Sequence, residues 1–183
     1  RAAVGYLLSS MNQYLDVVVP RGGKSLIKRV QDEARVPVIG HLEGICHVYL
    51  HESADTEMAK RITVNAKMRR TGICGAAETL LIDEAAAERL VPAVCNALAE
   101  SGCEVRGDET VRRLFADSSA ATEDDWSTEY LDKIISVRVV PDIHAATNHI
   151  ANYGSGHTEC IVAADTTAAE IFFADVDSAI LLH

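Results

Sequence analysis

The chain has 183 residues, of which 48% are hydrophobic and 24% charged, the balance of a soluble globular protein with length for one domain or parts of two. Its 17 Lys and Arg against 27 Asp and Glu give a net charge of −10. A chain this acidic lacks the basic surface that phosphate backbones require, so no nucleic-acid partner is expected. No apolar run approaches the roughly 20 residues of a membrane span, and no membrane partner is expected either.

The number and spacing of the cysteines indicate the redox environment in which the protein folds. The five cysteines are Cys46, Cys74, Cys95, Cys103 and Cys160. An odd number without a CxxC pair favours reduced thiols in a cytoplasmic protein over a disulfide framework or a zinc site. The chain opens on Arg1 without a secretion signal and ends on an apolar run followed by His183, which is typical of a fragment.

Short β-rich runs alternate with amphipathic helical patterns along the chain. In chain order we expect a strand over 16–19, a helix over 24–35, strands over 36–39 and 46–50, a helix over 54–68, a strand over 76–82, a helix over 84–101, a strand over 134–140, a helix over 143–151, a strand over 159–163, a helix over 167–173 and a strand over 177–182. This alternation predicts an α/β fold with a largely parallel sheet. The acidic segment 120–127 is expected to be a surface loop, and 70–75 a domain hinge.

The segment RRTGICGAAET, residues 69–79, places Cys74 near glycines and before an expected strand. The glycines expose the backbone to a substrate, and Arg69 and Arg70 could favour the thiolate of Cys74, which is how a nucleophilic cysteine is activated. The alternative is a small buried hydrophobe, the commoner role of a cysteine.

The segment PRGGKS, residues 20–25, lies between an expected strand and an expected helix. Backbone N–H groups at a helix start, with glycines for close approach and Lys24 for charge, suit a phosphate group. The motif matches neither a Walker sequence nor GxGxxG, so a plain strand-to-helix turn remains the alternative.

The segment HLEGICH, residues 41–47, gathers two histidines, a glutamate and a cysteine. Its spacing matches no standard zinc pattern, and polar residues beside a cleft are the favoured interpretation over a metal site.

A second polar segment, NYGSGHT, covers residues 152–158. It offers hydroxyls and an imidazole to a polar ligand, but it also fits a helix C-cap followed by a turn.

Taken together, the strings VPVIGHLEGICHVYL, VNAKMRRTGICGAAETLLID, WSTEYLDKIISVRVV and NYGSGHTECIV resemble the gamma-glutamyl phosphate reductases, also called glutamate-5-semialdehyde dehydrogenases. This family is a branch of the aldehyde dehydrogenase superfamily, and the resemblance runs from about residue 14 to 182. It implies an aldehyde dehydrogenase-like, three-layer α/β/α fold with a mostly parallel sheet. Residues 1–70 would be the end of a Rossmann-like cofactor domain and 71–183 most of the catalytic domain.

The resemblance implies an oxidoreductase of L-proline biosynthesis with Cys74 as its catalytic nucleophile. The thiolate of Cys74 would attack L-glutamyl 5-phosphate, and NADPH would reduce the thioester to L-glutamate 5-semialdehyde. The Cys74 N–H would contribute to an oxyanion hole. His41 stands where hydrolytic relatives carry a water-activating Glu, which suits an enzyme that must avoid hydrolysis. His41 would steer the phosphate or substrate, or Glu43 would take that role if the alignment shifts.

The resemblance also implies two sets of binding residues. The cofactor would contact Arg21, Gly22, Gly23, Lys24, Ser25 and Glu129, the last at the nicotinamide ribose. The substrate would contact Ser155, Gly156, His157 and Thr158. The partner is then a small molecule, no metal is implied, and assembly into a homo-oligomer stays open. Two alternatives remain: another aldehyde dehydrogenase, or a non-catalytic cofactor-binding or interaction fragment.

Overall fold

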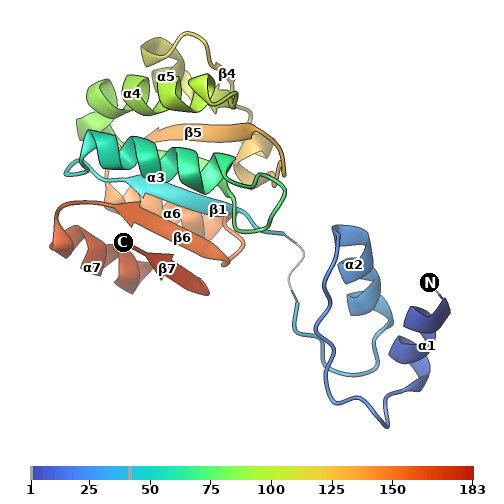
Figure 1. Ribbon diagram of the computed structural model, residues 1–183. Helices are drawn as coiled ribbons and strands as arrows, with labels where there is room; N and C mark the ends of the chain where they lie inside the picture. The colour runs from blue at the N-terminus through green and yellow to red at the C-terminus, as the bar shows by residue number, and fades with distance from the viewer. Residues whose placement is uncertain (1, 41–42) are drawn as a thin grey trace. The chain divides into compact units, whose positions relative to one another are not determined.

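The computed structural model describes residues 2–40 and 43–183, without the side chain of Lys24 (Figure 1). The chain divides into two compact units, Arg1–Glu43 and Gly44–His183. In the described part of the chain, none of the helices has both the length and the apolar character needed to cross a membrane.

The N-terminal unit is built on two short helices, α1 (Ala2–Ser10) and α2 (Lys24–Glu33). Leu8 of α1 and Val30 of α2 are its buried hydrophobic side chains, and the Arg35 N–H donates to the Leu8 carbonyl at 3.2 Å. This unit therefore has a small core.

The strands expected at 16–19 and 36–39 are reduced to one parallel bridge between Val18 and Val38. The Val18 N–H donates to the Pro37 carbonyl, and the Ile39 N–H donates to the Val18 carbonyl, both at 2.9 Å. Pro20 and Pro37 have no N–H to donate, so the ladder cannot extend past the bridge.

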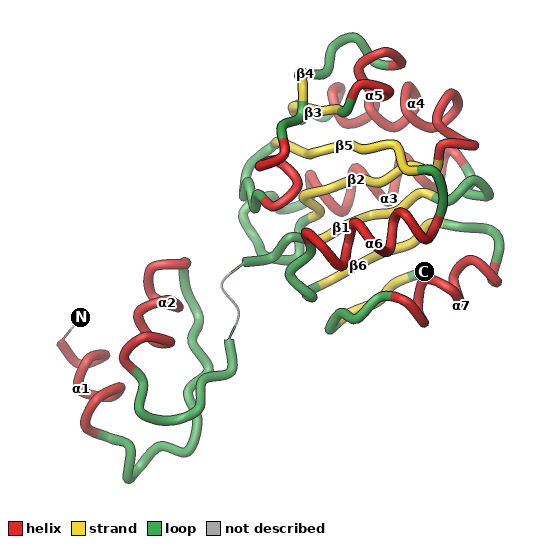
Figure 2. The backbone as a smooth tube through the Cα atoms, turned by 180° about the vertical axis from the view of Figure 1, so that it is seen from behind, coloured by secondary structure: helices red, strands yellow, loops and turns green. Residues whose placement is uncertain are grey.

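The C-terminal unit is built on a seven-stranded sheet of order β4-β3-β5-β2-β1-β6-β7, in which every neighbouring pair is parallel (Figure 2). The strands are β1 (Cys46–Leu50), β2 (Ala77–Asp83), β3 (Glu104–Gly107), β4 (Ser119–Ala120), β5 (Ile134–Val140), β6 (Thr158–Val162) and β7 (Ile180–Leu182). The expected α/β fold with a parallel sheet is confirmed.

Helices cover both faces of this sheet, which gives three layers (Figures 1 and 2). The helices are α3 (Thr56–Met68), α4 (Ala87–Glu100), α5 (Glu109–Leu114), α6 (Ile143–Tyr153) and α7 (Thr166–Asp175), with 3₁₀ turns η1 (Glu84–Ala86) and η2 (Glu123–Ser127). α3, α4 and α5 share one apolar core with the sheet, and α6 and α7 share the other.

The two cores follow from the alternation of side chains along each strand. In β1, Val48 and Leu50 belong to the core under α3 and α4, whereas Tyr49 belongs to the core under α6 and α7. All five residues of β1 are buried. Successive side chains of a strand point to opposite faces, so a strand covered on both faces buries its side chains on both.

The segment 120–127 is exposed at most of its positions, as expected of a surface segment, but it is not an irregular loop throughout. It contains η2, in which Asp125 and Trp126 are buried. Asp125 is buried because it is paired: Arg106 Nη1 donates to it at 2.8 Å and Tyr130 Oη at 2.6 Å. Hydrogen bonds of this kind compensate the loss of water around a buried carboxylate. The strands β3 and β4 and the helix α5 were not predicted.

The domain boundary also differs from the one expected at 70/71. β1 lies between β2 and β6 in the sheet, and α3 packs in the core with α4. Residues 44–70 therefore belong to the same compact unit as 71–183, and the division falls at 43/44. An element hydrogen-bonded at the centre of a sheet cannot belong to a different domain from that sheet.

Candidate functional site

The predicted site residues of the C-terminal unit gather at the amino ends of neighbouring parallel strands. Cys74 precedes β2, Glu129 precedes β5, and Ser155–His157 precede β6. Since β5, β2, β1 and β6 are adjacent and parallel, these segments enter the sheet along one edge. The sheet order therefore brings together residues that lie far apart in the sequence.

Cys74 lies on an exposed turn between α3 and β2. The Ala76 N–H donates to the Ile73 carbonyl at 3.0 Å and closes the turn. Gly72 and Gly75 are exposed and Cys74 is half-buried, while Cys46, Cys95 and Cys103 are buried. A half-buried thiol on an exposed turn favours the nucleophile over the core hydrophobe, because a substrate can reach it.

The start of β1 holds the backbone of this turn. Cys46 Sγ donates to the Cys74 carbonyl at 3.2 Å. A Cβ on Gly44 would lie 1.9 Å from the same carbonyl oxygen, so only glycine allows this close approach. Burial, and secondarily the charge of Glu159, raises the pKa of Cys46 to about 12. Cys46 therefore remains a protonated donor at neutral pH.

Glu129 is half-buried and joins this arrangement through its carboxylate. The Gly44 N–H donates to Glu129 Oε1 at 2.8 Å. Gly44 thus contacts two predicted site residues, because its N–H holds Glu129 and its Cα packs against Cys74. Gly44 was not singled out by the sequence, since its role depends on segments that are remote along the chain.

The segment 152–158 forms the helix C-cap and turn that its sequence allowed. Gly154 caps α6 through its N–H, which donates to the Ile150 carbonyl at 2.8 Å, and Gly156 has a φ of +67°. Ser155 Oγ accepts the Ile45 N–H at 2.9 Å. His157 Nδ1 lies 2.7 Å from Thr158 Oγ1 and 3.8 Å from Cys46 Sγ. The imidazole therefore lies beside the thiol that holds the Cys74 turn.

A buried pair of residues that the sequence did not reveal joins β1 to β6. His47 and Glu159 are fully buried side chains, and Glu159 Oε2 accepts both the His47 N–H, at 2.7 Å, and a bond with His47 Nδ1, at 2.9 Å. This pair fixes the start of β6 against β1. It thereby anchors the end of the loop 155–158, which Thr158 completes.

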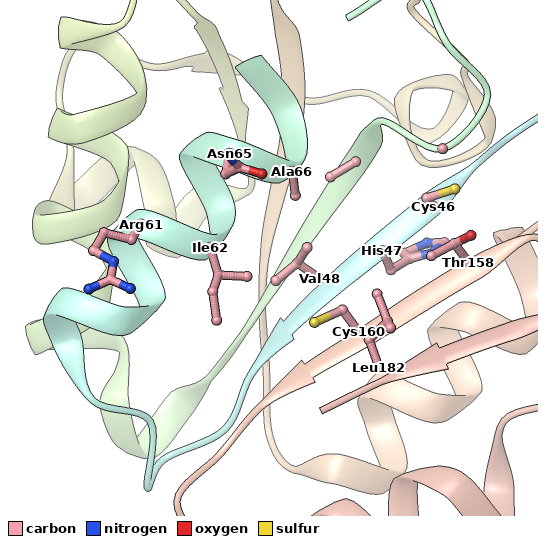
Figure 3. A pocket seen from close by; sticks show the side chains of 12 residues that line it. Cys46, His47, Val48, Arg61, Ile62, Asn65, Ala66, Thr158, Cys160 and Leu182 are labelled. Carbon is pink, nitrogen blue, oxygen red and sulfur yellow. The ribbon is translucent and has the colours of Figure 1, made fainter. Parts of the chain in front are cut away.

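A groove of about 610 Å³ lies beside these residues, between α3 and the strands β1, β6 and β7 (Figure 3). Arg61, Ile62 and Asn65 line it from α3, and Val48, Cys160 and Leu182 line it from the sheet. Cys46, Gly75 and Thr158 also line it, so the groove opens next to the candidate site.

The remaining predicted residues lie in the N-terminal unit or outside the described residues. Arg21, Gly22, Gly23 and Ser25 are exposed and lead into α2, where the Leu26 N–H donates to the Gly23 carbonyl at 2.9 Å. The expected turn into a helix is therefore present, with Lys24 as its first helical residue. His41 lies outside the described residues, and Glu43 is exposed.

The fold of the chain is shared with a known class of enzymes. The chain superposes on an acetylating aldehyde dehydrogenase from Geobacillus thermoglucosidasius with a TM-score of 0.72 at 20% identity, covering 99% of this chain and 48% of that one. The fold is thus that of the aldehyde dehydrogenases. No family model matches the chain.

More similar relatives carry one name. Gamma-glutamyl phosphate reductases from Hyphomonas neptunium and Parvibaculum lavamentivorans are 57% and 60% identical over the whole chain, which spans 43% of each. The solved gamma-glutamyl phosphate reductase of Thermotoga maritima gives a TM-score of 0.94 at 41% identity over all of this chain and 44% of its own. The resemblance seen in the sequence is confirmed, and the chain spans less than half the length of these relatives.

Proposed function

We propose that the protein carrying this chain is an oxidoreductase that reduces L-glutamyl 5-phosphate to L-glutamate 5-semialdehyde, with NADPH, in L-proline biosynthesis. The observation that carries the proposal is Cys74 on an exposed, glycine-flanked turn in a chain with full-length similarity to part of gamma-glutamyl phosphate reductases. The end of the cofactor domain then corresponds to Arg1–Glu43 and the catalytic domain to Gly44–His183. Its five free cysteines suit a cytoplasmic enzyme.

Cys74 is the nucleophile in this proposal. Its thiolate attacks the acyl carbon of the substrate, a C–S bond forms, and the bond to the phosphate oxygen breaks with release of phosphate. The resulting thioester takes up a hydride at its carbonyl carbon and a proton at its oxygen. The thiohemiacetal so formed collapses to the aldehyde, and the C–S bond breaks to restore Cys74.

Negative charge develops on the substrate carbonyl oxygen in both steps, and preorganised N–H donors lower the energy of such an oxyanion. The Cys74 N–H is our candidate donor. The peptide that carries it is fixed at its Ile73 carbonyl, which accepts the Ala76 N–H, and the next carbonyl, that of Cys74, is held by Cys46. A fixed peptide does not need to reorient during the reaction, which is the condition for this kind of catalysis.

NADPH supplies the hydride when bound. Glu129 fits a ribose hydroxyl, because a carboxylate accepts such donors and its Oε1 is already fixed by the Gly44 N–H. Arg21, Gly22, Gly23, Lys24 and Ser25 fit the pyrophosphate, since Gly23 precedes α2 and contributes no capping side chain. The choice of NADPH over NADH rests on the resemblance.

The loop 155–158 is our candidate for the glutamyl head group or the phosphate. Gly156 and Ser155 are exposed, and His157 and Thr158 are partly exposed beside the Cys74 turn. Their backbone and hydroxyl groups can donate to carboxylate or phosphate oxygens. His41 steers the phosphate or substrate in this proposal, and Glu43 is the alternative for that role.

The test is an assay of the natural gene product that contains this chain. We expect phosphate-dependent reduction of NADP⁺ with L-glutamate 5-semialdehyde, the reverse of the proposed reaction. Cys74→Ala should remove at least about 10⁴-fold of the activity, as loss of a covalent nucleophile does. Cys160→Ala is the matched control and should keep it. Activity that needs no phosphate would indicate a hydrolytic aldehyde dehydrogenase, and activity that survives Cys74→Ala would exclude the thioester route.

A further inference from the structure

A buried ion pair closes the base of the Cys74 turn. Lys67 lies at the end of α3 and Glu78 in β2, and Lys67 Nζ donates to Glu78 Oε2 at 2.5 Å. Both side chains have an exposure of 0%. Burial raises the pKa of Glu78, although Lys67 counteracts this rise. The pair therefore joins the two segments that enter and leave the turn.

The second oxygen of the same carboxylate reaches a different loop. The Leu131 N–H donates to Glu78 Oε1 at 3.3 Å. Leu131 has a φ of +54°, the only positive φ at a non-glycine position in the described residues. This conformation costs roughly 1 kcal/mol for a leucine, so the contacts of the loop must hold it in place.

The loop that contains Leu131 also carries Glu129, and a chain of contacts connects this loop with the Cys74 turn. Glu78 holds Leu131, and Glu129 accepts the Gly44 N–H. Gly44 packs against the Cys74 carbonyl, and Cys74 lies on the turn that the Lys67–Glu78 pair closes. One buried carboxylate thus bonds both to the helix that leads into the nucleophile turn and to the loop of the proposed ribose contact.

We propose that Glu78 is a positioning residue that sets Glu129 relative to Cys74, and through this distance the approach of the nicotinamide to the thioester. The inference rests on the proposed function. A buried ion pair contributes little net stability, because the desolvation of both charges offsets their attraction. An apolar pair of equal volume would offer the Leu131 N–H no acceptor, so it could not hold the loop of Glu129 relative to the Cys74 turn.

Two double variants separate the hydrogen bond from the charges. Lys67→Met/Glu78→Gln and Lys67→Met/Glu78→Leu both remove the ion pair, but only the glutamine offers Leu131 an acceptor. In the natural gene product we expect the KM for NADPH to be about fivefold to tenfold higher in the leucine variant than in the glutamine variant, the effect of one lost hydrogen bond. The KM for L-glutamyl 5-phosphate should be equal in the two, since the hydrogen bonds of Glu78 in the described residues go to Lys67 and Leu131 and none to the loop 155–158.

A merely structural role gives a different pattern. Loss of folded enzyme lowers kcat and leaves both KM values unchanged, so equal KM values for NADPH in the two variants would overturn the positioning role. Hydrogen exchange of the Leu131 amide is the second readout, and we expect it to be faster in the leucine variant. Equal exchange rates would also refute the contact. An inactive wild type would refute the proposed function instead, and the exchange rates would still decide whether Glu78 holds the loop.

If the leucine variant does not fold, Lys67→Met/Glu78→Met takes its place. Methionine has nearly the length and volume of glutamine, so the packing is kept, but it offers the Leu131 N–H no carbonyl or carboxylate oxygen. We expect the same selective rise in the KM for NADPH, and an unchanged KM would again contradict the proposal.

Discussion

Selective alkylation of Cys74 tests the site most directly. Burial raises the pKa of Cys103 and Cys160 to about 11 and that of Cys46 and Cys95 to about 12. At about pH 8 a thiol with a pKa of 11 is about 0.1% ionised, against about a quarter for free cysteine. Since the thiolate is the reactive form, each of these four thiols should react at least about 100-fold more slowly than free N-acetylcysteine.

The assay is limited treatment with iodoacetamide followed by peptide mass spectrometry, with N-acetylcysteine as an internal reference. We expect a single early adduct, on the peptide that contains Cys74. Cys74→Ser should remove this adduct and leave the slow labelling of the other cysteines unchanged. Labelling of Cys46 or Cys160 as fast as that of Cys74 would refute the argument from burial and exposure.

Three further predictions concern stability, measured by denaturant unfolding. Gly44→Ala should cost more than about 2 kcal/mol because its Cβ meets the Cys74 carbonyl, whereas Gly72→Ala, with open space around it, should stay within about 0.5 kcal/mol. Burial would raise the pKa of Asp125, but its hydrogen bonds with Tyr130, Thr122 and Arg106 outweigh burial and lower it. The ionised carboxylate therefore stabilises the folded state above about pH 4, and this stabilisation is lost as the pH falls further. The difference in the free energy of unfolding between wild type and Asp125→Asn should decrease in that range. Burial lowers the pKa of His149 to about 3, with smaller contributions from His47 and Arg138. As the pH falls below about 6.5, the unfolded chain therefore binds a proton before the folded chain does, and the free energy of unfolding of the wild type should decrease. The same decrease in His149→Leu would contradict this reasoning.

The sequence predicted the elements whose pattern is local. The strand expected over 134–140 is β5 with the same bounds, and the helix expected over 143–151 is α6 with two more residues at its end. These segments have unbroken apolar or amphipathic periodicity, which needs no tertiary information. β3 was missed because Glu104 and Arg106 interrupt its apolar pattern, and they lie there because both take part in ion pairs.

The site was predicted only in part, for a related reason. Cys74, Glu129 and the loop 155–158 stand in motifs that the resemblance could match, and the sheet brings them to one edge. Gly44 and Glu78 act through contacts with remote segments, and no pattern near them in the sequence records those partners. A charged residue inside a strand of otherwise largely apolar residues, such as Glu78 at the second position of β2, was the one available signal.

The pairing of β1 with β6 has a consequence for how the protein is made. His47 and Glu159 are separated by 112 residues, and the bonds between them close the longest loop of the site. Contacts of such high sequence separation form late in folding, because the entropy of closing the loop must be overcome first. During synthesis, residue 159 must leave the ribosome before the loop 155–158 can meet the Cys74 turn. The nascent chain therefore carries its candidate nucleophile, Cys74, through the synthesis of the 85 residues up to Glu159 before the site that would use it can form.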